Sequence, residues 1–297
     1  MTTSSAPADA PAFPAGGVDA LPPAAMARRA EEVGVAKAGL PAGKLLALAV
    51  LAGAFIAMGA VFATTVTAGS GELAFGVTRL LAGLAFSLGL VLVVVAGAEL
   101  FTGNNLVVMA WAGRRVATTR LLWTWLLVYV GNFAGAVATA ALVYAGRQYE
   151  LGGGAVGEQA LAIGVAKTSL GFGQAIALGA LCNALVCVAV WLTYSARTTA
   201  DRILAVVPPI AAFVAAGFEH SVANMYFVPF ALFVESDAGR LAGAGGALDT
   251  SGLTWSAFLL DNLVPVTIGN VLGGTLMVGA VYWFVYLRRA DPQGALR

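Results

Sequence analysis

The segment 217–225, GFEHSVANM, carries the chain's one histidine, His220, directly after Glu219. Long apolar runs flank this segment on both sides. Histidine is the side chain whose ordinary pKa lies near neutrality, so it is suited to accept and release protons at physiological pH. Ionisable residues inside membrane-spanning segments are costly and are functional by default. We therefore expect His220 to have a functional role.

A second polar segment, AGAELFTGNN at 96–105, interrupts another apolar run, between LGLVLVVV and LVVMAW. Both polar segments place a glycine two positions before a glutamate and an asparagine five positions after it. The matched residues are Gly97, Glu99 and Asn104 in one segment and Gly217, Glu219 and Asn224 in the other. A GNxxG motif follows each segment, at 131–135 and at 269–273. The chain is therefore predicted to consist of two related halves.

The elements that hold these segments are predicted to be membrane-spanning helices. The chain is 60% hydrophobic and 10% charged, whereas soluble domains are about 25% charged. One crossing needs about 20 apolar residues, and the composition predicts an all-α integral membrane protein with six of them. The predicted crossings, the second and fifth interrupted, are Leu45–Gly71, Leu80–Ala98 with Gly103–Gly113, Leu121–Gly146, Thr168–Ala196, Ile203–Phe218 resumed to Val234, and Asn262–Leu287.

Lysine and arginine are distributed unequally between the two ends of these crossings. Twelve of the 16 lie on the side that holds both termini, and such residues collect in cytoplasmic loops. Both termini are therefore predicted to be cytoplasmic, and the start of the chain lacks the order of a signal peptide. We divide the chain into a cytoplasmic segment at 1–40, disordered at first and then a short surface helix, a transport domain at 41–290 and a cytoplasmic tail at 291–297.

Each half has three crossings, an odd number, so the second half is predicted to run inverted relative to the first. A broken helix leaves backbone groups that lipid cannot satisfy, so it must be buried in protein or line a water-filled path. The positive ends of the half-helices then favour an anion near the midplane. The alternative is structural: the glutamates and asparagines join helices by hydrogen bonds, and the GNxxG glycines allow close packing. This alternative applies to Glu99, Asn104, Asn132 and Asn270.

Other polar residues in the crossings are open to two interpretations. Asn183, in the middle of the fourth crossing, would orient the histidine or contact a substrate. Lys167, at the outer end of that crossing, either anchors the helix by snorkelling or attracts anions. Cys182 and Cys187 are too few for a disulfide framework or a zinc site. We predict no metal, no cofactor and no nucleic-acid partner.

Four stretches together, AELFTGN, CNALVCVAVW, GFEHSVANM and NLVPVTIGN, resemble the formate/nitrite transporter family, and the resemblance runs from about residue 44 to 289. It implies an aquaporin-like protomer of the inner membrane and a homopentamer with one pore in each protomer. It also implies passage of small monovalent anions of weak acids, namely formate, nitrite or hydrosulfide. Two positions differ from the family's formate members: Glu99 stands where they often carry aspartate, and the loop after LFT continues GNN. The preferred anion is therefore not decided among these three, and formate is expected first.

The resemblance also implies roles for single residues. His220 resembles the family's central pore histidine, with Asn183 and Glu219 positioning it. Thr102 resembles the loop threonine that faces the histidine, and Lys167 resembles a vestibule lysine. Two constrictions are implied, a periplasmic one of Phe86 and Phe213 and a cytoplasmic slit of Leu90, Leu100, Phe101 and Val186.

The predicted mechanism follows from the cost of placing a naked anion in an apolar constriction. Lys167 draws the anion in, and the two phenylalanines remove its water. The anion then takes up a proton, from His220 or by relay through it, and crosses the slit as the neutral acid.

Two other classes of function were compared with this prediction. A neutral-solute facilitator of the aquaporin kind would carry paired Asn-Pro-Ala segments at the breaks, and neither break has them. An intramembrane serine hydrolase would use Ser221 beside His220, but adjacent residues on a helix point in different directions. The sequence therefore predicts a transporter and not an enzyme.

Overall fold

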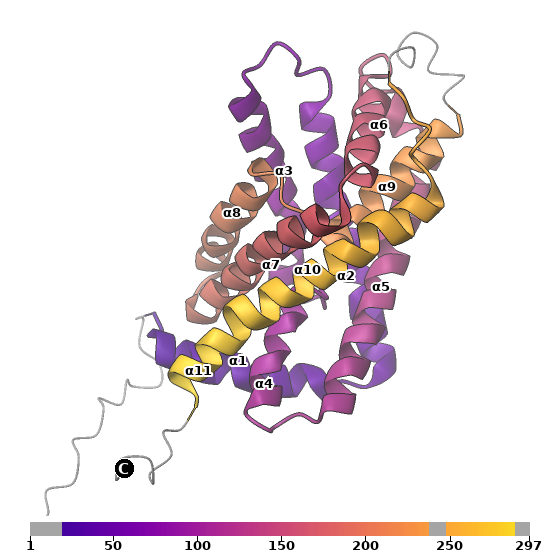
Figure 1. Ribbon diagram of the computed structural model, residues 1–297. Coiled ribbons are helices and arrows are strands. Elements are labelled where there is room, and N and C mark those ends of the chain that lie inside the picture. Colours follow the sequence, from indigo (N-terminus) through magenta and orange to yellow (C-terminus); the bar gives the residue numbers. More distant parts are fainter. Residues whose placement is uncertain (1–19, 238–247, 289–297) are drawn as a thin grey trace, which may run out of the picture.

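The computed structural model describes residues 20–237 and 248–288, and within these ranges it is helical and has no strand (Figure 1). The predicted disorder at the N-terminus falls mostly on positions 1–19, outside the described residues. The predicted tail at 291–297 also lies outside them. The all-α prediction is confirmed for the part of the chain that the structure describes.

Five helices in the described ranges are long and apolar enough to cross a membrane. They are α2 (Ala42–Thr67), α3 (Phe75–Ala96), α5 (Thr118–Ala145), α7 (Phe172–Ser195) and one continuous helix from Ala257 to Tyr286. The last helix joins η4 (Ala257–Leu263), α10 (Val264–Leu272), η5 (Gly273–Ala280) and α11 (Val281–Tyr286), of which η4 and η5 are π-helical. Many large apolar side chains remain exposed on these helices, such as Leu126, Leu142 and Leu276. The protein is an integral membrane protein.

The predicted second crossing is broken, because α3 ends at Gly97 in the left-handed conformation with φ 82°. The chain resumes as η1 (Gly103–Val107) and α4 (Val108–Ala112). The predicted fifth crossing breaks in the same way after α8 (Thr199–Ala215), at Gly217 with φ 78°, and resumes as α9 (Ser221–Glu235). A left-handed residue that ends a helix is most often glycine, because only glycine adopts this conformation without steric cost.

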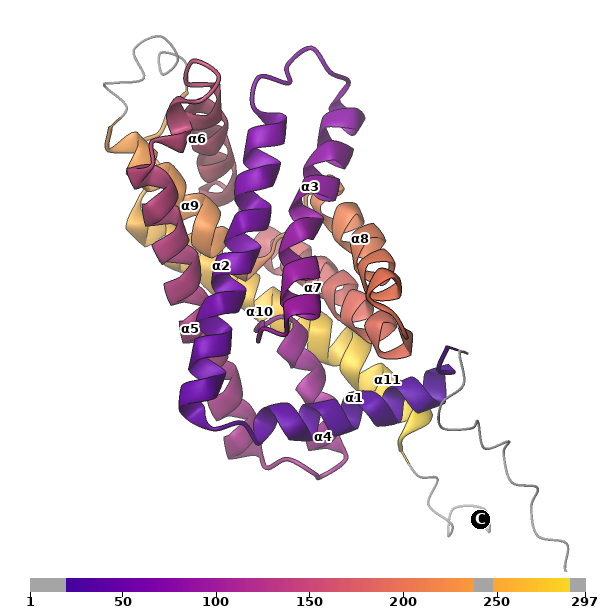
Figure 2. The same ribbon diagram turned by 180° about the vertical axis from the view of Figure 1, so that it is seen from behind.

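In the described ranges, three short helices lie outside these crossings. Helix α1 (Pro23–Ala38) runs across one end of the bundle, and α6 (Ala155–Thr168) stands at the other end (Figure 2). The short η2 (Gln148–Glu150) precedes α6. The prediction had no helix over 155–168 and began the fourth crossing at Thr168, whereas that residue ends α6 and α7 begins at Phe172.

The GNxxG glycines lie where helices cross closely. Helix α2 packs on α5 in the first half, and α7 packs on α10 in the second. A Cβ atom added to Gly135 would overlap the carbonyl oxygen of Val50, and one added to Gly273 would overlap that of Ala180. Small residues allow backbones to approach in this way, so the two halves use the same helix crossing.

Candidate substrate path

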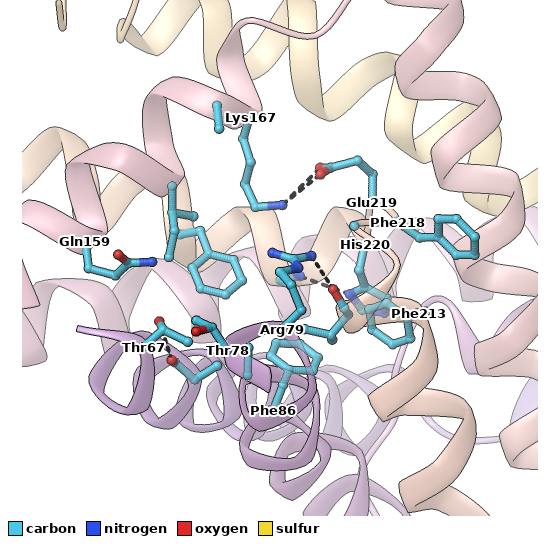
Figure 3. A pocket seen from close by; sticks show the side chains of 18 of the residues that line it. Thr67, Thr78, Arg79, Phe86, Gln159, Lys167, Phe213, Phe218, Glu219 and His220 are labelled. Carbon is cyan, nitrogen blue, oxygen red and sulfur yellow. Dashed lines mark hydrogen bonds and ion pairs between the residues drawn. The ribbon is translucent and has the colours of Figure 1, made fainter. Parts of the chain in front are cut away.

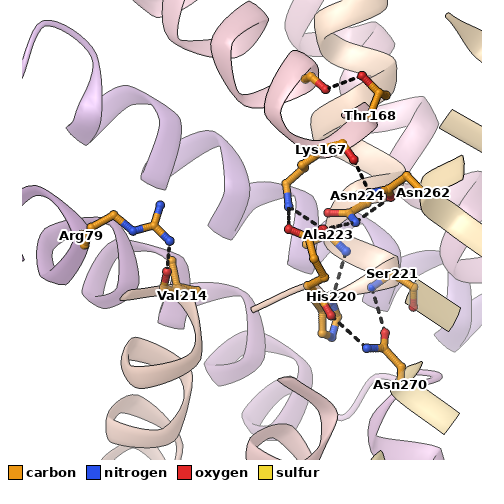
Figure 4. Close-up of polar contacts among 12 residues, drawn as sticks. Arg79, Lys167, Thr168, Val214, His220, Ser221, Ala223, Asn224, Asn262 and Asn270 are labelled. Atoms are coloured by element: carbon orange, nitrogen blue, oxygen red, sulfur yellow. Dashed lines mark hydrogen bonds and ion pairs between the residues drawn. The ribbon is translucent and has the colours of Figure 1, made fainter. Parts of the chain in front are cut away.

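The two helix breaks contact each other through Thr102 and His220. Thr102 Oγ1 lies 3.0 Å from His220 Nε2. The other ring nitrogen, Nδ1, accepts a 3.0 Å hydrogen bond from the backbone N–H of Ala223 and so caps the first turn of α9 (Figure 4). A neutral ring that accepts at Nδ1 carries its hydrogen on Nε2, so it donates to Thr102. Both side chains are buried, with 0% and 3% of their surface exposed.

A cavity of about 480 Å³ opens beside His220, which is one of its lining residues. Lys167, in the last turn of α6, donates from Nζ to both carboxylate oxygens of Glu219, at 3.0 and 3.1 Å. Phe86 and Phe213 line the same cavity, with their ring centroids 5.8 Å apart in an edge-on contact. Figure 3 shows these side chains around one space, which we call the Lys167 cavity. The structure thus brings five of the predicted residues together.

A second cavity, of about 310 Å³, lies at the first break, and Leu90 and Leu100 line it. Lys37, from α1, donates from Nζ to Glu99 Oε2 at 2.8 Å and to Asn104 Oδ1 at 2.9 Å. The Asn104 amide donates to the same carboxylate oxygen at 2.8 Å. We call this space the Lys37 cavity.

The GNxxG asparagines satisfy the backbone groups that the breaks leave free. Asn132 Oδ1 accepts from the Phe101 N–H at 2.8 Å, and its Nδ2 donates to the carbonyls of Ala49 and Glu99 at 2.7 and 2.9 Å. Asn270 repeats this pattern in the second half, with the Ser221 N–H as its donor and with Gly179 and Glu219 as its carbonyl acceptors. Since lipid offers no partner to such groups, these two amides hold the broken backbone inside the protein.

Comparison with known proteins decides what kind of protein carries this arrangement. The sequence profile of the family described as formate/nitrite transporter matches residues 24–284. The chain belongs to this family. Formate channel FocA of Escherichia coli strain K12 is 44% identical over 276 residues, covering 92% of this chain and 97% of the relative. Formate channel FocA of Haemophilus influenzae is 39% identical and covers 77% of this chain and 81% of the relative.

Solved structures agree with the family assignment. A pentameric formate channel with formate bound has a TM-score of 0.76 and 42% identity, covering 83% of this chain and 98% of that one. An ion channel of the same family has a TM-score of 0.73 and 27% identity, over 88% of this chain and 98% of that one. Members of this family are transporters, so the chain is not an enzyme. The hydroxyl of Ser221 also makes no hydrogen bond with any described residue.

Besides Thr102, three predicted site residues of this transporter are absent from the two cavity linings. Asn183 donates to Asn105 Oδ1 at 2.8 Å and to the Asn270 carbonyl at 2.6 Å, so it joins the segment after the first break to α10 and does not contact the histidine ring by a hydrogen bond. Phe101 packs edge-on against Tyr129 of α5, with centroids 4.9 Å apart. Val186 is buried in the core among the helices.

Lys37 lines the Lys37 cavity and is a candidate site residue that was not predicted, because the sequence analysis assigned its segment only to a surface helix. A signal for it exists in the sequence. The stretch VAKAGL at 35–40 matches VAKTSL at 165–170, so Lys37 and Lys167 occupy equivalent positions in the two halves. The repeat therefore includes α1 and α6 as well as the crossings.

Proposed function

We propose that this protein is a formate channel in which His220 couples passage of the anion to uptake of a proton. The family assignment and the 44% identity to a formate channel support formate as the substrate. The contact of Thr102 with His220 supports the proposed mechanism, because histidine is suited to exchange protons and this one lies where the two breaks meet. Nitrite and hydrosulfide are the alternative substrates.

The proposed topology has six crossings in two inverted repeats, as in an aquaporin-like protomer. The matched breaks at Gly97 and Gly217 support it, with α8 and α9 together forming the fifth crossing. We place residues 41–290 in the inner membrane as the transport domain, with both termini in the cytoplasm, because lysine and arginine favour that side. A homopentamer is proposed from the similarity to a pentameric formate channel.

In this topology the Lys167 cavity faces the periplasm and the Lys37 cavity faces the cytoplasm. The anion enters the Lys167 cavity, and Phe86 and Phe213 remove its water. It takes up a proton at His220, directly or by relay, and leaves as the neutral acid past Leu90 and Leu100. Phe101 and Val186 are assigned to this slit by resemblance to the family, as Asn183 is assigned to positioning the histidine with Glu219.

The hydrogen bonds of His220 restrict how it handles a proton. In the neutral ring, Nδ1 is occupied by the Ala223 N–H. A second proton on the ring must take that position, so the imidazolium form gives up the cap of α9. The charged ring is therefore transient, and it returns to the neutral form when it delivers a proton to the anion.

The test is stopped-flow uptake by proteoliposomes at about pH 5 and about pH 7, on either side of the ordinary histidine pKa. Formate, nitrite, hydrosulfide and glycerol are compared in the wild type and in His220→Asn. Asparagine keeps a capping acceptor for α9 but does not titrate, so it separates proton exchange from structure. Formate flux that acid enhances in the wild type but not in the variant is expected. Equal acid enhancement in both proteins would overturn the role of His220, and flux of glycerol without anion flux would overturn the proposed function.

A further inference from the structure

Arg79 of α3 lines the Lys167 cavity, and no carboxylate in the lining is left to neutralise its positive charge. The lining contains two cations, Arg79 and Lys167, and one carboxylate, Glu219. Lys167 is paired with that carboxylate at 3.0 Å. Arg79 forms no ion pair within 4.0 Å with any described carboxylate. An anion in the cavity is therefore attracted chiefly by Arg79.

The guanidinium of Arg79 is anchored by backbone at one edge and free at the other. Its Nε donates to the Ala215 carbonyl at 3.1 Å, and its Nη2 donates to the Val214 carbonyl (Figure 4). These carbonyls belong to the end of α8, which the chain leaves through Gly217. A guanidinium has five N–H donors in one plane. Its Nη1 forms no hydrogen bond to any residue in the described ranges, and Nη2 has a second N–H parallel to one of Nη1. These two N–H groups form the outer edge of the guanidinium, here called the Nη1 edge, and it is available to a ligand.

The position of Arg79 puts this free edge at the entrance of the phenylalanine constriction. Arg79 precedes Phe86 by seven residues, about two turns, on the same face of α3. Its two carbonyl acceptors directly follow Phe213 in the chain. Figure 3 shows the guanidinium in the cavity, with Lys167 and Glu219 on one side of it in this view and Phe86 on the other.

We propose that Arg79 contacts the substrate in the Lys167 cavity through the Nη1 edge and makes this cavity prefer planar anions with two oxygens, such as formate and nitrite, over hydrosulfide. This inference rests on the proposed function of anion passage. A guanidinium fork matches two oxygens of a planar anion with two parallel N–H donors. The ammonium of Lys167 is a point charge without this shape, and it is already bonded to Glu219.

The test measures half-saturation concentrations and maximal rates for formate, nitrite and hydrosulfide in proteoliposomes, after subtraction of flux through protein-free vesicles. Arg79→Lys keeps the charge and loses the fork, so half-saturation for formate and nitrite should rise about tenfold, the scale of one charge-assisted hydrogen bond. Half-saturation for hydrosulfide should stay within about twofold. Arg79→Gln keeps a donor for the α8 carbonyls and loses the charge, so all three anions should bind more weakly.

Arg147→Lys is the matched control, since Arg147 is exposed and paired with Glu150 outside the cavity lining. It should leave every constant unchanged. Equal losses for all three anions in Arg79→Lys would show that Arg79 only braces the end of α8, and this result would overturn the inference, as would constants equal to those of the wild type. A wild-type protein that moves no anion would instead overturn the proposed function, and the inference with it.

Discussion

The break after α3 and the break after α8 are built from the same contacts. Each follows a glycine with positive φ, 82° at Gly97 and 78° at Gly217. Each has a buried glutamate that pairs with a lysine from a helix at one end of the bundle, at 2.8 Å in the first half and 3.0 Å in the second. Each glutamate also accepts from the asparagine five residues later. The polar groups that close a break are therefore common to both halves.

The breaks differ at the position directly after the glutamate. Leu100 stands there in the first half and lines the Lys37 cavity, whereas His220 stands there in the second half and lines the Lys167 cavity. Two positions after Leu100, the hydroxyl oxygen of Thr102 lies 3.0 Å from Nε2 of His220. The contacts that close a broken helix therefore occur twice, once in each half. The proton exchange that we propose depends on His220, which has leucine as its counterpart in the first half.

The strongest test of the shared scaffold is to block the helix crossing in either half. Gly135→Val and Gly273→Val each place side-chain atoms on the carbonyl of a neighbouring helix. We expect each variant to lose more than about 3 kcal/mol, enough to abolish folded protein. The amount of folded protein is measured from size-exclusion profiles in detergent. Gly43→Ala and Gly173→Ala, at equivalent positions with no atoms within 4 Å of the added Cβ, are the controls and should fold normally. A valine tolerated in one half would mean that the scaffolds are not equivalent.

A smaller and equally symmetrical effect is expected from the break asparagines. Asn132→Ala and Asn270→Ala each remove three hydrogen bonds to buried backbone. At about 1 kcal/mol for each bond, we expect similar losses of about 3 kcal/mol. Thermal unfolding in detergent gives the comparison. Thr139→Ala on α5 serves as the control, because that hydroxyl bonds only within its own helix. If one asparagine proved dispensable, backbone satisfaction would not be its role.

Much of this scaffold could be predicted from the sequence, because it is repeated there. The spacing of Gly97, Glu99 and Asn104 recurs in the second half, and a repeated polar interruption in apolar helices has few structural solutions. Helix α6 was missed because Glu158 and Lys167 divide its apolar run, so a search for charge-free segments passes over it.

Contacts between residues of the two halves could not be predicted from the spacing of residues in the sequence. Thr102 and His220 are 118 positions apart and share no periodicity, so only the family resemblance linked them. Arg79 is one of the four lysines and arginines on the side opposite the termini, and nothing else in the sequence marks it. Its two carbonyl partners lie about 135 residues away at the end of α8, where backbone geometry and not residue type creates the acceptors.

The smallest effects are expected from variants of the two glutamates, and these effects should differ between the two halves. Glu219→Gln and Glu99→Gln each remove the carboxylate from a lysine and keep a polar side chain of the same size. Lys167 is less exposed than Lys37, with 14% against 26% of its side chain accessible. We therefore expect a larger loss of stability from Glu219→Gln, on the order of 2 kcal/mol, than from Glu99→Gln, at about 1 kcal/mol.

The effect on transport should depend on the side from which the anion enters. An unpaired Lys167 attracts anions more strongly into its own cavity, so Glu219→Gln should lower the half-saturation concentration for formate applied from that side. Glu99→Gln should do so only from the opposite side, through Lys37. Influx and efflux in vesicles of known protein orientation measure both. Each lysine lines its own cavity. We expect the contact of Thr102 with His220 to separate the two cavities. A variant that changed influx and efflux by the same amount would contradict this separation.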